Sequence, residues 1–184
     1  MDNKLEQQII ALYNPNLVDL FSINKIATKL KKTYPYVNKK VTELLQRGIL
    51  KKTIVGKSYL CSLNFENDET LLYLSMNELQ KKKAVDAAEL DSFAKENMLT
   101  LSIQCIVKSK NRLIFVIDDL KDRREIERRF EKAVIVDRKE FADMLIDEPE
   151  LFKEHTVIEG RESFFRLLRT VLDELKKKHS PLSY

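Results

Sequence analysis

The chain has 184 residues but only three glycines, whereas average usage predicts roughly 13. Glycines so scarce and so far apart exclude the dinucleotide-binding fingerprint and the P-loop, which both need closely spaced glycines. A hydrophobic content of 43% is enough for the core of one ordinary domain or two small ones, and the net charge of +4 is modest.

The start of the chain, MDNKLEQQII, has no basic segment followed by an apolar run, and the longest apolar stretch, residues 113–117, is too short to cross a bilayer. We therefore expect a soluble, cytoplasmic protein with no membrane contact. Cys61 and Cys105 lie in apolar, strand-like stretches, which predicts two reduced, buried thiols. No His or Cys spacing is typical of a metal site, and we predict neither a metal nor a cofactor.

The positive charge is concentrated at one end of the chain. Residues 1–64 hold eleven Lys and Arg against four Asp and Glu, which gives +7, and the remainder carries −3. A basic first module joined to a slightly acidic second one predicts that any affinity for a polyanion belongs to the first.

Three short helices are predicted in the first module. The first covers residues 4–13, where apolar side chains recur every three or four positions. The second begins after Ser22, a good N-cap residue. The third begins after Thr33, which can cap it, has Pro35 in its first turn and ends at Gly48.

Two β-prone runs, residues 49–55 and 58–63, follow the helices and predict a hairpin that turns near Gly56. Three helices and a hairpin are the plan of a winged helix, and residues 22–63 resemble the archaeal-type winged helix-turn-helix DNA-binding superfamily. Ala27 takes the place of that family's small residue in the second helix. The segment LLQRGIL is similar to the family's exit from the third helix into the wing.

This resemblance implies that the third helix enters the major groove and that the wing touches the DNA backbone. Tyrosine, threonine and asparagine side chains can bond to bases or phosphates, and lysines neutralise phosphates. The predicted DNA-binding residues are Thr33, Tyr34, Tyr36, Asn38, Lys39 and Lys40 of the third helix and Lys51, Lys52 and Lys57 of the wing. The alternative is that these lysines form a solvated face and the module binds protein. Arg47 is interpreted as a cation favoured at a helix C-terminus.

Two connector helices are predicted next, over residues 68–82 and about 85–96. The first carries apolar residues on a broad face, which include Leu72, Met76 and Leu79. Such faces can pack between the modules or form the seam of a homodimer, although no strict heptad requires a coiled coil.

The remainder alternates between strand and helix patterns, which predicts an α/β layer on a small mixed sheet. The first two strands are close enough in sequence for a hairpin around Ser109 and Lys110. The predicted strands are residues 101–108, 112–117, 133–137 and 156–158, and the predicted helices are residues 120–130, 139–152 and 162–178.

The segments NRLIFVIDD, KAVIVDRKEF and HTVIEGRESFFRLL resemble the minimal nucleotidyltransferase fold that follows winged helices in archaeal proteins. Active members carry Gly-Ser after the first strand and Asp-x-Asp at the second, because two carboxylates hold Mg²⁺. Here the corresponding positions are Lys108, Ser109, Asn111 and Leu113. The resemblance therefore implies a scaffold without catalysis, and Asp118 and Asp119 are interpreted as helix-capping residues.

Together these patterns predict a two-domain chain of mixed α+β and α/β class. Residues 1–66 form the winged helix, 67–98 the helical connector and 99–184 the inactive nucleotidyltransferase-like domain. The predicted function is transcription regulation on double-stranded DNA, with a homodimer or a protein partner at the connector or the last domain. A protein-interaction adaptor is the alternative, and an active nucleotidyltransferase ranks third.

Overall fold

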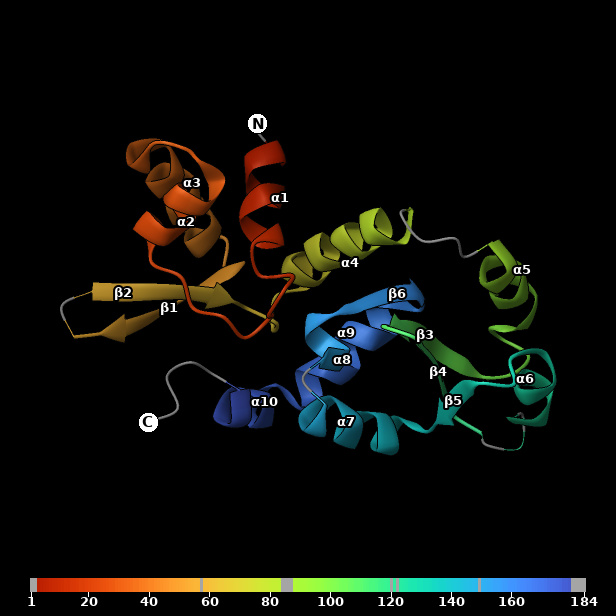
Figure 1. Cartoon of the computed structure of the whole chain (residues 1–184). Coiled ribbons are helices and arrows are strands. Elements are labelled where there is room, and N and C mark those ends of the chain that lie inside the picture. The colour runs from red at the N-terminus through yellow and green to blue at the C-terminus, as the bar shows by residue number, and fades with distance from the viewer. Residues whose placement is uncertain are drawn as a thin grey trace. The chain divides into compact units, whose positions relative to one another are not determined.

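The computed structural model describes residues 3–56, 58–83, 88–119, 121, 123–148 and 150–179. The chain is an α+β protein whose described residues form two separate small sheets (Figure 1). It divides into two compact units, one of Met1–Asn77 with Lys176–Tyr184 and one of Glu78–Leu175. No helix among the described residues is both long enough and apolar enough to cross a membrane.

The first unit has the helices and the hairpin expected from the sequence, with bounds that differ by no more than two residues. Ser22 caps the second helix, because its Oγ accepts a hydrogen bond from the Lys25 N–H at 3.2 Å. Thr33 occupies the N-cap position of the third helix, but its hydroxyl makes no capping bond, which differs from the prediction. The elements are α1 (Asn3–Ala11), α2 (Ile23–Leu30), α3 (Tyr34–Gln46), β1 (Leu50–Val55), β2 (Ser58–Leu63) and the start of α4 (Asp68–Lys83).

The loop between α1 and α2 is fixed onto the hairpin. Phe21 exchanges two backbone hydrogen bonds with Cys61 of β2, at 3.0 and 2.8 Å. The buried Tyr13 hydroxyl donates to the Cys61 carbonyl at 2.9 Å, and its ring packs 4.8 Å from the ring of Phe21. In β1, by contrast, only Leu50 is buried. The base of the hairpin is therefore anchored to the helices, and the rest of β1 is open to solvent.

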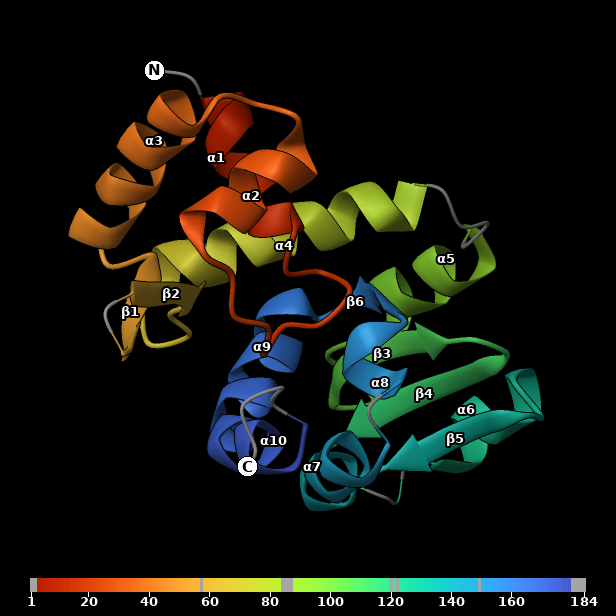
Figure 2. The same cartoon turned by 60° about the vertical axis from the view of Figure 1, so that its left-hand side comes forward.

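The second unit is built on a four-stranded mixed sheet of order β5-β4-β3-β6, which can be followed in Figure 2. The β4–β5 pair is parallel and the other pairs are antiparallel. The predicted hairpin is present, since Ser109 pairs with Arg112 across the β3–β4 turn. The strands are β3 (Ile103–Ser109), β4 (Arg112–Ile117), β5 (Ala133–Val136) and β6 (His155–Glu159).

Helices cover both faces of this sheet (Figure 1). Phe93 of α5 (Ala88–Asn97) and Ile126 of α6 (Arg123–Arg129) share one buried cluster with Phe115 of β4. The neighbouring strand residues Ile114 and Val116 point to the opposite face, because side chains alternate along a strand, and they are fully buried too. On that face pack α7 (Arg138–Asp147) and α9 (Arg161–Thr170).

Two predicted helices are each divided in the structure. Residues 139–152 form α7 and a short α8 (Glu150–Lys153), and residues 162–178 form α9 and α10 (Leu172–His179). Glu148, which ends α7, has φ −118° and ψ 86°, outside the helical region. It precedes a proline in the sequence, and the residue before proline is biased away from helical geometry. The long periodic pattern concealed this break.

Gly160 lies where β6 turns into α9, and no other residue fits there. Its φ is +70°, and a Cβ atom at this position would lie 2.0 Å from the Gln104 carbonyl oxygen and 2.7 Å from the Cys105 Cα of β3. Both atoms are backbone in the middle of the sheet and cannot move aside. Gly56 also has positive φ, at +59°, but nothing lies within 4 Å of an added Cβ there.

We therefore expect Gly160→Ala to lower the free energy of unfolding by more than about 3 kcal/mol, through steric overlap with β3. Gly56→Ala is the matched control and should lower it by only about 1–2 kcal/mol, the strain of left-handed backbone. Urea unfolding followed by circular dichroism measures both. Equal losses in the two variants would contradict the packing described at Gly160.

Candidate nucleic-acid interface

The start of α3 presents unburied aromatic side chains. Tyr34 and Tyr36 are 47% and 43% exposed, although both are large and apolar enough to be buried elsewhere in a small domain. Lys39 is exposed on the outward face of the helix, opposite the buried Val37. Asn38 is half-buried at the edge of this face. The first turns of α3 thus combine hydrogen-bonding groups with a positive charge on an open surface.

The hairpin adds two more exposed cations. Lys51 and Lys52 both lie on the open part of β1. The Lys52 Nζ is 4.1 Å from the centre of the Tyr59 ring, a cation–π contact that orients the ammonium group without neutralising it. Lys57, the third predicted wing residue, lies outside the described residues.

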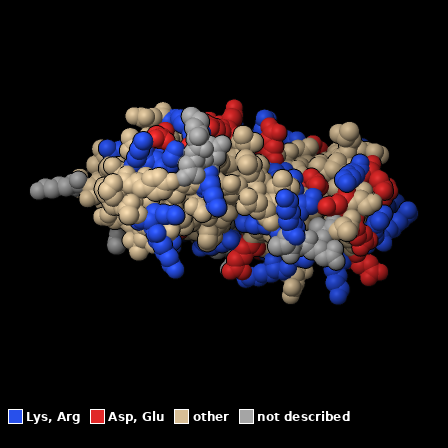
Figure 3. Space-filling model, turned by 90° about the horizontal axis from the view of Figure 1, so that it is seen from above, with Lys and Arg blue, Asp and Glu red and all other residues tan. Residues whose placement is uncertain are grey.

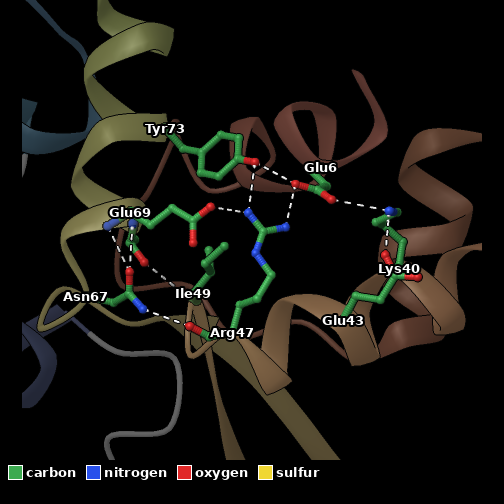
Figure 4. Close-up of polar contacts among 9 residues, drawn as sticks. Glu6, Lys40, Glu43, Arg47, Ile49, Asn67, Glu69 and Tyr73 are labelled. Atoms are coloured by element: carbon green, nitrogen blue, oxygen red, sulfur yellow. Dashed lines mark hydrogen bonds and ion pairs between the residues drawn. The ribbon is translucent and has the colours of Figure 1, made fainter. Parts of the chain in front are cut away.

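Lys40 does not belong to this exposed set. Its Nζ lies 3.2 Å from the Glu6 Oε1 of α1 and 2.5 Å from the Glu43 Oε2, and its side chain is only 12% exposed (Figure 4). This geometry argues against the prediction that Lys40 contacts phosphate. Helical periodicity placed Lys40 away from the core, but it could not show that this flank of α3 faces α1.

Arg47 is the centre of the same polar network. Its guanidinium donates to the Glu6 Oε2 at 2.8 Å and to Glu69, and it lies 3.4 Å from the Tyr73 hydroxyl (Figure 4). Tyr73 in turn donates to Glu6 at 2.5 Å. Arg47 therefore joins α1, α3 and α4, a larger role than the helix-end cation expected from the sequence.

Glu6 is buried at the heart of this network, with 3% of its side chain exposed. Burial alone raises the pKa of its carboxyl group, but the hydrogen bonds from Tyr73, Arg47 and Lys40 outweigh burial and lower the pKa below its ordinary value. The partners respond in the opposite sense: Glu43 first, and then Glu6, raise the pKa of Lys40. Glu6 is therefore held ionised by three donors.

The segment that leads from α3 into β1 is held by three side chains. The amide groups of Asn64 and Asn67 donate to the carbonyl oxygens of Gly48 and Arg47, at 2.6 and 2.9 Å. The Thr70 hydroxyl donates to the Ile49 carbonyl at 3.0 Å. These bonds hold the backbone of residues 47–49, which lead from the end of α3 into β1. The direction of the hairpin relative to α3 is consequently fixed by α4 and the residues before it.

The acidic side chains of this network occupy Lys40 and Arg47 and leave the other cations unpaired. Within the described residues, no carboxylate lies within 4.0 Å of the remaining lysines on α2, on the turn that follows it, on α3 and on β1. Figure 3 shows more Lys and Arg than Asp and Glu on the visible surface of α2 and α3. These unpaired lysines are Lys25, Lys29, Lys31, Lys32, Lys39, Lys51 and Lys52.

Lys25 and Lys29 were missed as candidates. Their ammonium groups lie 5.2 and 5.4 Å from the centre of the Phe21 ring, at the outer side of α2. Their spacing of four residues on a predicted helix, opposite its apolar face, was the available signal. They extend the exposed basic surface from α3 to the helix that precedes it.

The structure places three positions of the second unit that the sequence analysis compared with a nucleotidyltransferase centre, namely Ser109, Asn111 and Leu113. The Ser109 hydroxyl donates to the Glu154 carbonyl at 3.1 Å. Asn111 and Leu113 line an open pocket together with Arg128 and Lys132. Among the described residues, no three His, Cys, Asp or Glu side chains are grouped so that they could hold a metal ion.

Asp118 and Asp119 have separate structural partners. Asp118 accepts two bonds from the Arg138 guanidinium, at 2.6 and 3.0 Å, so it forms an ion pair and not the expected cap. Asp119 accepts a bond from the Lys121 N–H at 3.0 Å, which resembles capping. Both carboxylates are therefore accounted for by the fold.

Comparisons of the chain with protein-family models, with curated proteins and with solved structures found no match. What the first unit binds is therefore inferred from the charge, exposure and contacts of its own residues. The feature that these residues present most clearly is an unpaired basic surface around α3 and the hairpin.

The lowered pKa of Glu6 predicts a pH dependence of stability. Because the pKa is lower in the folded chain than in the unfolded one, ionised Glu6 stabilises the fold above the unfolded value of about 4.3. That contribution is lost as the pH falls through the folded pKa. Glu6→Gln should lower the free energy of unfolding at pH 7 by about 2 kcal/mol and flatten its decline below pH 5.

Urea unfolding at a series of pH values tests this, with Glu125→Gln as the control because Glu125 is exposed on α6. The control should reproduce the pH profile of the unaltered chain. A Glu6→Gln profile parallel to the unaltered one would show that the network does not depend on the charge of Glu6.

Proposed function

We propose that the chain is a cytoplasmic DNA-binding transcription regulator whose first unit docks on duplex DNA as a winged helix. In this arrangement α3 lies in the major groove and the β1–β2 hairpin is the wing that follows the backbone. The proposal rests on the order of the elements, on the exposed side chains at the start of α3, and above all on the separation of charge in the first unit.

That separation of charge is the observation that carries the proposal. The buried Glu6, together with Glu43 and Glu69, takes up the charges of Lys40 and Arg47 on one flank of α3. Among the described residues, Lys39 on the outward face of α3 and Lys51 and Lys52 on the hairpin form no ion pair with a carboxylate. A surface that concentrates unpaired positive charge raises the local concentration of a polyanion, and DNA is the polyanion for which this element order is suited.

Sequence readout is assigned to the first turn of α3. Helix N-termini carry unpaired backbone N–H groups and a partial positive charge, which favour an approach to phosphate. Thr33, Tyr34, Tyr36 and Asn38 supply hydroxyl and amide groups beside that end. In our proposal they contact base edges or the adjoining phosphates, whereas Lys39, Lys51 and Lys52 neutralise phosphates without reading sequence.

The fixed junction between α3 and the hairpin supports the same function. A recognition helix and a wing can contact one duplex together only if their mutual orientation is maintained. Asn64, Asn67 and Thr70 hold the residues that join the two elements. Less conformational freedom is then lost on binding.

We assign the second unit a non-catalytic role, as a nucleotidyltransferase-like domain that receives a partner or assembles a dimer. The pocket beside Asn111 and Leu113 is lined by three cations, Arg128, Arg129 and Lys132, and by the single carboxylate of Glu131, whereas the chemistry needs two carboxylates to hold Mg²⁺. The proposed domain boundaries stay those expected from the sequence, with residues 67–98 as a helical connector.

One observation favours a second candidate function, that of a protein-interaction adaptor. Ile54 and Val55, near the tip of the hairpin, are 76% and 43% exposed. Exposed apolar side chains on a projecting hairpin suit a protein contact as well as a DNA contact. An adaptor should have no affinity for duplex DNA at low salt.

For DNA docking, we expect the variant Lys39→Ala/Lys51→Ala/Lys52→Ala to bind random-sequence duplexes more weakly. The slope of log K against log salt concentration should fall by about 3, because each lost phosphate contact removes about one unit. Fluorescence anisotropy over a salt titration measures both quantities, and selection from the random pool identifies the preferred site.

The matched control is Lys95→Ala/Lys108→Ala/Lys132→Ala, which removes the same charge from exposed positions of the second unit. It should keep the affinity and slope of the unaltered chain. If the two triple variants lose the same slope, the net charge and not the α3 surface drives binding. If the unaltered chain does not bind at low salt, the adaptor is favoured.

We further expect the purified chain with Mg²⁺ and nucleoside triphosphates to transfer no nucleotide to protein or nucleic acid, because the aligned positions hold Asn111 and Leu113 instead of carboxylates. Incorporation of label from α-³²P nucleotides is the measurement. Transfer that requires Mg²⁺ and is abolished by Asp118→Asn would overturn the non-catalytic assignment.

A further inference from the structure

Helix α4 carries a line of exposed apolar side chains. Leu72, Met76 and Leu79 are 60%, 44% and 45% exposed, whereas Leu71 and Leu74 of the same helix are buried. Spacings of four and three residues place the three exposed side chains in one stripe along the helix. The geometry of this stripe is set by α4 itself, which is one continuous helix (Asp68–Lys83).

The stripe ends in opposite charges. Asp68 lies four residues before Leu72 and Lys83 lies four residues after Leu79, so both continue the same line, and both are exposed. The neighbouring cation Lys82 has partners of its own, since it pairs with Asp91 and Glu159 at 2.7 and 2.6 Å. The exposed stripe is therefore acidic at its start, apolar in its middle and basic at its end.

This pattern is complementary to itself. A twofold axis across the helix between residues 75 and 76 relates Asp68 to the position of Lys83 and Leu72 to that of Leu79. Met76 then lies beside the axis, next to its own copy. Two antiparallel α4 helices thus bring each acidic end against a basic end and each apolar side chain against another, as a symmetric dimer contact requires.

We propose that two copies of this chain associate through antiparallel α4 helices along the stripe of Asp68, Leu72, Met76, Leu79 and Lys83. We assign a second copy of this chain to the stripe because the stripe, when turned end to end, presents charges complementary to its own. The stripe can therefore be explained without a different partner. Antiparallel helix dipoles add to the attraction. A seam of one helix pair is smaller than a standard interface, so the association is weak and depends on concentration.

This inference does not depend on DNA binding, and sedimentation equilibrium of the full chain without DNA tests it. Asp68→Lys and Lys83→Asp each place like charges together twice in a homodimer, and each should raise the dimer Kd about tenfold. In an equimolar mixture the two variants become complementary and should associate as well as the unaltered chain. Asp68→Lys/Lys83→Asp should also restore homodimers.

Rescue in the mixture excludes a mere loss of folding, which circular dichroism of each variant checks separately. In a parallel seam the unaltered chain already brings Asp68 against Asp68 and Lys83 against Lys83, so neither single variant weakens the homodimer further and Asp68→Lys/Lys83→Asp restores nothing. Single variants that associate as well as the unaltered chain would therefore refute the antiparallel arrangement. A chain that stays monomeric into the submillimolar range overturns the proposal and leaves the stripe to another protein.

Disulfide trapping locates the axis. Met76→Cys should form a covalent dimer on mild oxidation, because the two copies of residue 76 lie beside the axis. Asp68→Cys should not, because the two copies are about 22 Å apart along the antiparallel helices, beyond the reach of a disulfide. The native thiols give little background, since Cys61 and Cys105 are buried and burial raises the pKa of both. Trapping through residue 68 and not 76 would refute the antiparallel arrangement.

Discussion

The first unit depends on one buried carboxylate. An ionised Glu6 without partners would be strongly destabilising inside the fold, so the packing of α1 is possible only where Arg47, Lys40 and Tyr73 converge on it. These partners come from α3, from its C-terminal end and from α4. The network therefore selects one arrangement of three helices, and the same contacts decide which cations remain available at the surface.

The sequence predicts the helices and strands of both units well because their boundaries are set by local chemistry, such as the Ser22 cap and the turn at Gly56. It does not predict the ion pairs of Lys40 and Arg47, because their partner Glu6 is 34 and 41 residues away. A helical pattern shows which residues avoid the core. It does not show whether a flank meets solvent or another helix, and this difference removes Lys40 from the candidate surface.

In the second unit, too, a contact between residues far apart in the sequence could not be predicted, here at the edge of the sheet. Alternating apolar runs predict the strands, but nothing local identifies Glu78 as the group that covers an edge. The buried Glu78 carboxylate accepts a hydrogen bond from the Val157 N–H of β6 at 2.9 Å. β6 is an edge strand, where an open N–H invites pairing with another chain. Glu78, which the sequence assigned to a connector helix, thus pairs with a backbone N–H at the edge of the sheet.

Helix α4 consequently has three separable faces. Glu69 and Tyr73 belong to the network of the first unit, and Glu78 belongs to the sheet edge of the second. The stripe from Asp68 to Lys83 contributes to neither set of contacts. Because Glu69, Tyr73 and Glu78 lie off the stripe, substitutions at its exposed charged ends, Asp68 and Lys83, can change self-association while these contacts are kept. A helix that only linked two domains would have no reason to leave an ordered, self-complementary face exposed.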